Sequence, residues 1–220
     1  MRAAIVRFPG TVDEQHVQRS LTRLGFTTVI LPHTASQLEA ADLLVLPGGA
    51  AYGNYIRPGA IARLAPIREA AAAFVESGGL VLGLGNGFHI LTEWELLPGV
   101  LVANPSLRFQ CRAELIRVER TDTPFTGLFA RGEILSMPIS SAYGSYQLDQ
   151  ERLAELEKRG QVVFRYVENP NNSVAAAAGI VSEKGNVLGM LPQPERGGDD
   201  GERLFRSILH SFERRVSHGA

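Results

Sequence analysis

The chain has 220 residues, of which 45% are hydrophobic and 20% charged, and its formal net charge at pH 7 is -1. This composition predicts a folded globular protein rather than a disordered one, and we expect one domain over residues 1–220. The basic residues are scattered, which excludes the charge pattern of a protein that binds nucleic acid or an anionic membrane and favours small molecules or proteins as partners.

The first half of the chain alternates predicted strands and helices. Continuous apolar runs predict strands at 3–8, 27–31, 42–47 and 80–84. Apolar residues at helical spacing predict a helix that carries Val17 and Leu21 and is closed by Gly25, and a second helix over 58–77 with Leu64 on its apolar face. The strands are apolar throughout rather than alternating, so we expect them to lie in a parallel sheet that is covered on both faces.

This alternation predicts an α/β fold with a doubly wound, mainly parallel sheet. Two glycine-rich loops follow strands of that sheet, one at 47–53 and one around Gly85. Ligands of such sheets bind outside the carboxyl ends of the strands, so we expect the functional site at these two loops.

The second half of the chain is less regular and adds further strands. Apolar stretches predict them at 113–119, 133–139, 161–167 and 174–181. A tight turn is expected at 183–186. Asp199 and Asp200 are expected to cap a final amphipathic helix with Leu204 and Ile208 on its apolar side.

The stretch LVLGLGNGFHIL, residues 80–91, predicts a strand that passes into a helix through a tight turn at Gly85. Such an elbow lifts one residue above the sheet edge and directs backbone N–H groups toward a developing oxyanion, so a nucleophile belongs at its apex. Gly85 supplies none. From spacing alone, a close approach of helix to strand is the favoured interpretation of the glycines at 83, 85 and 87, because short glycine patterns are weak signals.

Cysteine content and hydropathy exclude several other classes. The single cysteine excludes a disulfide framework and a cysteine zinc site within the chain, and we expect neither a metal nor a cofactor. No charged-then-apolar leader precedes Ala3, and no run of about 18 apolar residues occurs. We therefore expect a cytoplasmic protein with no membrane partner.

Five stretches of the sequence form a specific pattern in a fixed order. They are FPG (8–10), LPGGAAYGNYIRPGA (46–60), GNGFHILTEWELLPG (85–99), NPNNS (169–173) and GNVLGMLPQPER (185–196). Together they resemble the glutaminase subunit of phosphoribosylformylglycinamidine synthase, a class I glutamine amidotransferase of the purine pathway. The resemblance runs nearly end to end. It implies a flavodoxin-like fold, glutamine as substrate, and ammonia passed to a large synthetase subunit, with a small accessory subunit completing the complex.

The resemblance also implies where the catalytic residues lie. The family's nucleophilic cysteine corresponds to Gly85, and the histidine that serves as its base corresponds to Gln193. The acidic residue that orients this histidine corresponds to Glu195 and is the only one retained. Hydrolysis of an amide by this route needs a thiolate and an imidazole, which glycine and glutamine do not provide. We therefore expect the chain to lack glutaminase activity.

The substrate-binding positions implied by the resemblance are Ala50, Asn86, His89, Ser141 and Tyr143. Backbone N–H groups near Ala50 and Asn86 are the expected oxyanion donors. His89 stands where the family has a glutamine that helps to hold the substrate. Ser141 and Tyr143 belong to a loop whose polar recognition groups in the family are mostly replaced here.

Several of these residues also have simple structural interpretations. Glu195 is interpreted as a carboxylate that pairs with Arg196 or another basic group. His89 is interpreted as a hydrogen-bonded side chain rather than a catalyst, although it is expected to face the former pocket. Cys111 is expected to be buried in a strand as a small hydrophobe. Three residues of the first glycine-rich loop either contact a partner or pack that loop: Tyr52, Tyr55 and Arg57.

Three hypotheses about function follow. The favoured one is a catalytically silent homologue that keeps the scaffold and binds a synthetase-like partner or a second copy of itself. The second is a working amidotransferase subunit whose activity uses external groups or which serves an ammonia-dependent synthetase. The third is a small-molecule binding protein or redirected enzyme that uses a pocket made roomier at Gly85 and lined by His89, Ser141 and Tyr143.

Overall fold

The computed structural model describes residues 1–218, with side chains through residue 214. Within these residues a nine-stranded sheet has the order β2-β1-β3-β4-β11-β10-β9-β6-β7, and β5 pairs with β8 in a separate ribbon. The strands are β1 (Arg2–Arg7), β2 (Thr27–Pro32), β3 (Leu43–Leu46), β4 (Leu80–Leu84), β5 (Val100–Val102), β6 (Gln110–Val118), β7 (Ile134–Ser141), β8 (Ser145–Gln147), β9 (Val162–Tyr166), β10 (Ala177–Val181) and β11 (Val187–Met190).

The sheet has a parallel half and an antiparallel half. Strands β2, β1, β3, β4 and β11 are parallel, in the 2-1-3-4-5 order of flavodoxin-like folds. From β11 outward, every neighbouring pair is antiparallel. The predicted doubly wound fold with additional strands in the second half is therefore confirmed.

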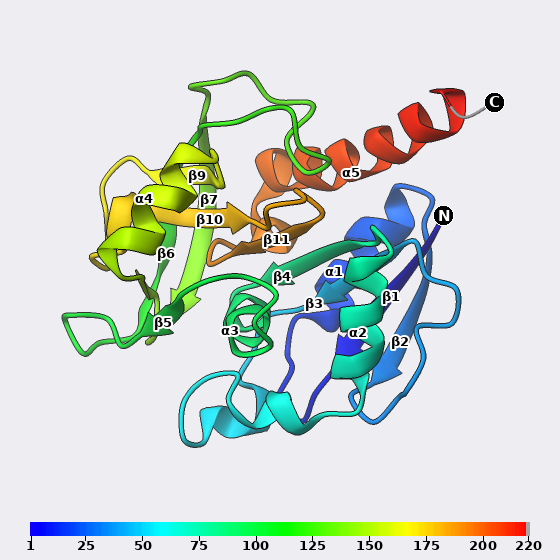
Figure 1. Cartoon of the computed structure of the whole chain (residues 1–220), viewed down its shortest axis with the longest axis horizontal. Coiled ribbons are helices and arrows are strands. Elements are labelled where there is room, and N and C mark those ends of the chain that lie inside the picture. The colour runs from blue at the N-terminus through cyan, green and yellow to red at the C-terminus, as the bar shows by residue number, and fades with distance from the viewer. Residues whose placement is uncertain (219–220) are drawn as a thin grey trace.

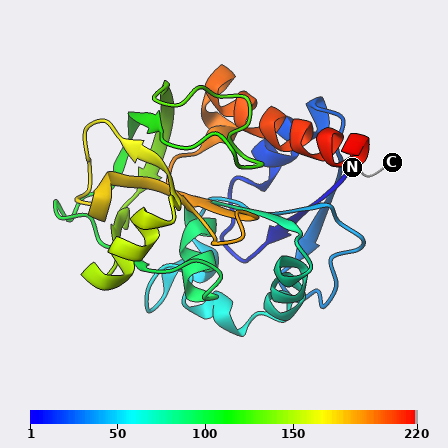
Figure 2. The same cartoon turned by 45° about the horizontal axis from the view of Figure 1, so that its top comes forward.

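Helices cover both faces of the parallel half (Figures 1 and 2). The helices of the described residues are α1 (Glu14–Arg23), α2 (Ile67–Glu76), α3 (Asn86–Glu93), α4 (Gln150–Lys158) and α5 (Gly198–His218), and α4 lies beside the antiparallel half in Figure 1. In Figure 2, α1 and α5 lie above the sheet, and α2 and α3 lie below it. This arrangement explains why β3 and β4 are buried along their whole length.

The helix predicted over 58–77 is in fact two pieces. A 3₁₀ turn spans Ile61–Leu64, and α2 begins only at Ile67. Between them Ala65 is extended, with ψ 131°, because a residue that precedes a proline, here Pro66, avoids the helical conformation. Leu64, expected on the apolar face, is 84% exposed.

Two further predictions about secondary structure need correction. The strand expected over 174–181 is shorter, because residues 174–176 form a 3₁₀ turn in which Ala175 has a φ of 54°, and β10 begins at Ala177. Asp199 and Asp200 lie inside the first turn of α5. The Asp200 carboxylate accepts a hydrogen bond from the Ser136 N–H of edge strand β7.

No helix among the described residues combines the length and the apolar character that a bilayer crossing requires.

Because β1, β3, β4 and β11 are parallel, their carboxyl ends lie at one edge of the sheet. The two glycine-rich loops lie at this edge.

Candidate functional site

The segment that follows each of four parallel strands carries a residue of the candidate site. Asp13 follows β1, Gly48 follows β3, Gly85 follows β4 and Gln193 follows β11. They lie close together: a methyl group placed on Gly48 would be 2.6 Å from Asp13 Oδ2 and 2.8 Å from Gln193 Nε2. The site therefore forms at the carboxyl ends of the strands, as the sequence predicts.

The turn at Gly85 has the backbone geometry of an elbow. Its φ is 52° and its ψ is -108°, a conformation that side-chain-bearing residues rarely adopt. The Gly85 N–H donates to the Met190 carbonyl at 2.9 Å, which fixes the turn to β11. A Cβ at this position would lie 3.6 Å from Gln193 Nε2. The elbow is kept, and the Gln193 amide faces its apex.

The Asn86 side chain fastens the elbow to the first glycine-rich loop. Its Oδ1 accepts from the Ala51 N–H at 3.0 Å, and its Nδ2 donates to Asn54 Oδ1 at 3.1 Å. The Ala50 N–H donates to the Gly10 carbonyl at 2.8 Å. The N–H groups of Ala50 and Ala51 thus already have protein acceptors, and the expectation that N–H groups near Ala50 and Asn86 serve as oxyanion donors stays a prediction.

Asp13 is the hub of a buried polar network beside the elbow. Its carboxylate accepts from Gln193 Nε2 at 3.1 Å and from Arg196 Nε at 2.9 Å, and Arg196 also reaches it through its second guanidinium nitrogen. The Asp13 side chain is only 4% exposed. This hydrogen bonding raises the pKa of the Arg196 guanidinium. The network joins the loop after β1 to the loop after β11.

Glu195 does not form the ion pair expected for it. Arg196 binds Asp13 instead, and both Glu195 carboxylate oxygens are buried without a hydrogen-bond partner among the described residues. Burial, together with the negative charge of Asp13, raises the pKa of Glu195 to about 8. Glu195 is therefore mostly a neutral carboxylic acid at pH 7.

The predicted substrate-binding residues line one cavity of about 160 Å³, which we call the elbow cavity. It is bounded by Gly49, Ala50, Asn54, Pro58, Asn86, His89, Phe109, Ser140, Ser141, Ala142 and Tyr143. All five predicted positions are among them. Gly85, Gln193 and Glu195 are not among the lining residues.

His89 lies on α3 and is 4% exposed. Desolvation lowers the pKa of its imidazole to about 4, although a hydrogen bond to the Tyr143 backbone works in the opposite direction. The ring is therefore neutral at pH 7. This agrees with the interpretation of His89 as a hydrogen-bonded side chain that faces the former pocket.

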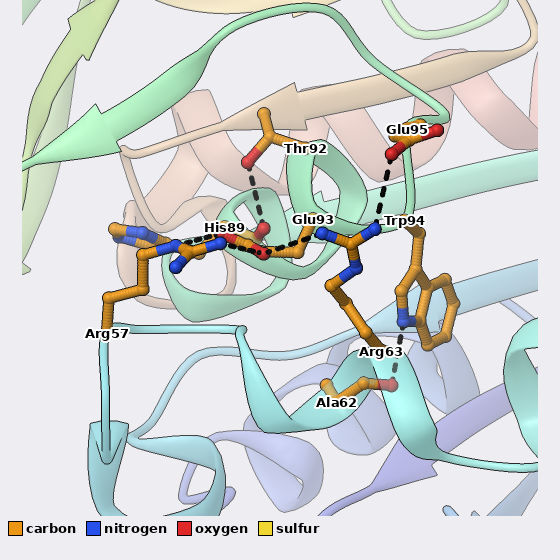
Figure 3. Close-up of polar contacts among 8 residues, drawn as sticks. All are labelled: Arg57, Ala62, Arg63, His89, Thr92, Glu93, Trp94 and Glu95. Carbon is orange, nitrogen blue, oxygen red and sulfur yellow. Dashed lines mark hydrogen bonds and ion pairs between the residues drawn. The ribbon is translucent and has the colours of Figure 1, made fainter.

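The loop that carries Arg57 is held against α3 by polar contacts (Figure 3). The Arg57 guanidinium binds the buried Glu93 carboxylate through two nitrogens, at 2.6 and 2.9 Å. The Trp94 indole N–H donates to the Ala62 carbonyl at 2.9 Å. Tyr52 packs inward and contacts His33, with 2.7 Å between Tyr52 Oη and His33 Nδ1. These contacts account for Tyr52 and Arg57 as loop-packing residues.

Cys111 was expected to be buried, and this expectation is wrong. It is exposed on β6. The burial pattern of β6 alternates near its end, and Cys111 lies on the face opposite to the buried Glu114 and Ile116. A strand at the antiparallel side of the sheet is covered on one face only, so a small apolar residue on the other face reaches solvent.

Comparison with known proteins decides the family. Residues 1–204 match the CobB/CobQ-like glutamine amidotransferase domain. A phosphoribosylformylglycinamidine synthase subunit PurQ from Thermus thermophilus is 49% identical over 97% of this chain and 100% of its own length. The chain belongs to the glutamine amidotransferase family.

Solved structures agree with this assignment. A chain in the structure of PurLQS from Thermotoga maritima superposes with a TM-score of 0.89 at 38% identity, covering 96% of this chain and 98% of that one. A glutamine amidotransferase from Thermotoga maritima shares the fold at 14% identity, with a TM-score of 0.62 over 100% of this chain and 85% of that one.

Within this glutamine amidotransferase fold, sequence reasoning missed Asp13 as the centre of the polar network. The sequence signal for Asp13 was its place in the loop after the first predicted strand. The cavity-lining roles of Asn54, Phe109 and Ser140 were also missed, since these residues come from three separate loops and strands.

The described residues contain no group of three or more His, Cys, Asp or Glu side chains that could hold a metal ion.

The Asp13 network predicts a loss of stability on Asp13→Ala. The substitution leaves the buried Gln193 amide without its acceptor and unpairs Arg196, so we expect the free energy of unfolding in urea to fall by about 2–3 kcal/mol. Asp122→Ala is the matched control, because Asp122 also pairs with an arginine but is 70% exposed. It should cost less than about 1 kcal/mol. Equal losses in the two variants would contradict the assignment.

Glu195 predicts a pH dependence of stability. Its pKa is about 8 in the folded chain against an ordinary value of 4.5, so the folded state binds the proton more tightly. The free energy of unfolding should therefore decrease as the pH rises from about 4.5 to about 8. Glu195→Gln removes this contribution. The melting temperature of the variant minus that of wild type should therefore be larger at about pH 8.5 than at about pH 5. Thermal melts of both proteins at both pH values test this prediction. The same difference in melting temperature at the two pH values would refute it.

Proposed function

We propose that this chain is a catalytically silent homologue of the glutaminase subunit, and that it acts by binding. The observation that carries this proposal is the pairing of Gly85 with Gln193 at the elbow, where a Cβ on the glycine would face the Gln193 amide at 3.6 Å. Neither residue offers a nucleophile or a group that relays protons at neutral pH. The elbow therefore retains its backbone shape without its chemistry.

Two further observations support the proposal. Cys111 is the single cysteine of the chain, and it is exposed on β6 and absent from the lining of the elbow cavity. Asp13 holds Gln193 and Arg196 in a buried network beside the elbow. These hydrogen bonds of Asp13 stabilise the folded chain, but they do not activate an attacking group.

We propose a synthetase large subunit and a small accessory subunit as binding partners. The support is the similarity to a chain in the structure of PurLQS from Thermotoga maritima, together with an apolar surface beside the elbow cavity. Tyr55 and Ile56 are 73% and 84% exposed on the loop that carries Arg57. Large apolar side chains that are exposed next to each other are typical of interaction sites.

The glutaminase prediction is tested with Gly85→Cys. We expect wild type and this variant to release glutamate from glutamine at the rate of the buffer blank, because Gln193 still cannot act as a base. A glutamate dehydrogenase assay measures release, and mass spectrometry of the intact chain detects a glutamyl adduct. An active subunit PurQ, assayed in parallel, is the positive control. Release by wild type, or an adduct on it, would establish the working amidotransferase instead.

The binding prediction is tested by size-exclusion chromatography with light scattering. The purified chain is mixed with the synthetase large subunit and the small accessory subunit from the same organism, and we expect co-elution. Tyr55→Ser with Ile56→Ser should weaken the complex at least about tenfold, whereas Leu64→Ser, at an equally exposed leucine, should not. A monomeric mass and no co-elution would contradict a role through binding.

A further inference from the structure

The nine-stranded sheet has two edge strands, β2 and β7, and their outer sides differ. On β7, the Ser136 N–H donates to the Asp200 carboxylate at 2.8 Å. Pro138 has no N–H, and its carbonyl accepts from the Gln193 N–H at 2.9 Å. Proline and covering segments are devices by which natural proteins keep an edge strand from pairing with another chain. The middle of β7 is therefore blocked.

Strand β2 is the opposite edge, at the right-hand end of the sheet in Figure 1. In a parallel pair, alternate residues of a strand bond to the neighbouring strand, and the residues between them point away from it. The His33 N–H, just past β2, donates to the Arg7 carbonyl of β1 at 3.0 Å, so the odd-numbered residues face β1. Thr28 and Ile30 therefore direct their N–H and C=O groups away from β1. Among the described residues, no hydrogen bond is recorded for these outward groups.

The side chains of β2 do not oppose pairing either. Its sequence, TTVILP, contains no charged residue, and Thr28, Val29 and Ile30 are each half-buried. Threonine, valine and isoleucine favour extended strands, and charged residues are a common protection of an edge. Pro32 is the last residue of the strand, so it leaves the N–H groups of Thr28 and Ile30 available.

We propose that the outer edge of β2 binds the same edge of a second copy of this chain, antiparallel and about a two-fold axis. Placing Val29 opposite Val29 of the second copy sets Thr28 of each copy opposite Ile30 of the other. In an antiparallel ladder, the two residues of such a pair exchange both of their N–H···O=C bonds. All the outward N–H and C=O groups of Thr28 and Ile30 are then satisfied, and the two sheets join into one.

A second copy fits this edge for two further reasons. No charge of one strand meets a like charge of the other, because β2 carries none. The contact uses the same patch on both chains, and such an isologous contact closes on itself. Because the middle of β7 is blocked, the joined sheet does not extend further through its outer edges. The expected product is a dimer rather than a filament.

Sedimentation equilibrium of the purified wild-type chain tests whether the dimer forms. Strand β2 contributes no residue to the elbow cavity, so this test is independent of the proposed function. We expect a dissociation constant of about 10–100 µM, because a contact through one strand is small. A monomer at every concentration up to about 1 mM would overturn the proposal.

Amide hydrogen exchange, followed by NMR, assigns the contact to β2. Raising the chain concentration from about a tenth to about ten times the dissociation constant should slow exchange at Thr28 and Ile30 about fourfold, as the monomer fraction falls. The Val29 and Leu31 amides are the internal control, because they face β1 and should be protected at every concentration. A dimer without the change at Thr28 and Ile30 would overturn the proposal.

Two sets of variants complete the test. Thr28→Pro removes an N–H that β1 does not use and should weaken the dimer at least about tenfold, whereas the matched control Thr28→Val keeps that N–H and should dimerise as wild type does. Val29→Lys should also weaken the dimer, and an equimolar mixture with Val29→Glu should form a heterodimer, because these side chains face each other across the axis. The mixture decides the matter if Thr28→Pro does not fold. A Val29→Lys dimer as tight as wild type, or no heterodimer in the mixture, would overturn the proposal.

Discussion

The elbow at Gly85 is the constraint on which the rest of the site depends. Its positive φ turns the chain from β4 directly into α3, and helix and strand then approach so closely that a methyl group on Gly87 would overlap the Leu46 carbonyl oxygen of β3. Glycine is therefore required on packing grounds at 87. At 85 it meets a backbone angle, and a Cβ there would be at ordinary contact distance, 3.6 Å from Gln193 Nε2. Because the packing does not need a cysteine, the fold survives without one.

The polar groups around the elbow form a structural network centred on Asp13. In a working triad, an acid orients an imidazole that faces the nucleophile. Here Gln193 turns to Asp13, and Glu195 is left buried with no hydrogen-bond partner among the described residues. A buried carboxyl group without a partner is destabilising when ionised, which is why its pKa is high. Asp13 supplies the stabilising contacts of this network, to Gln193 and Arg196.

The lining of the elbow cavity bears on function. Gly85, Gln193 and Glu195 are not among the lining residues of the cavity, and the lining includes no Asp, Glu, Lys or Arg. Exposed Tyr55 and Ile56 lie on a loop whose other large residues, Tyr52 and Arg57, are tied to the body of the chain. Partner binding would therefore use different side chains from those that pack the loop.

The sequence by itself determined the parallel half of the sheet, the elbow and the absence of a nucleophile, since these depend on local apolar runs, glycine spacing and residue identity. The break before Pro66 also follows from a local rule, because a residue that precedes a proline avoids the helical conformation. The sequence did not determine the conformation of Ala175, the exposure of Cys111 or the partner of Arg196. Those depend on which surfaces meet: Asp13 and Arg196 are 183 residues apart in the chain and become neighbours only because β1 and β11 end at the same edge of one sheet. Long-range pairing of polar groups is decided by tertiary packing, because no local pattern encodes the distance between two strand ends.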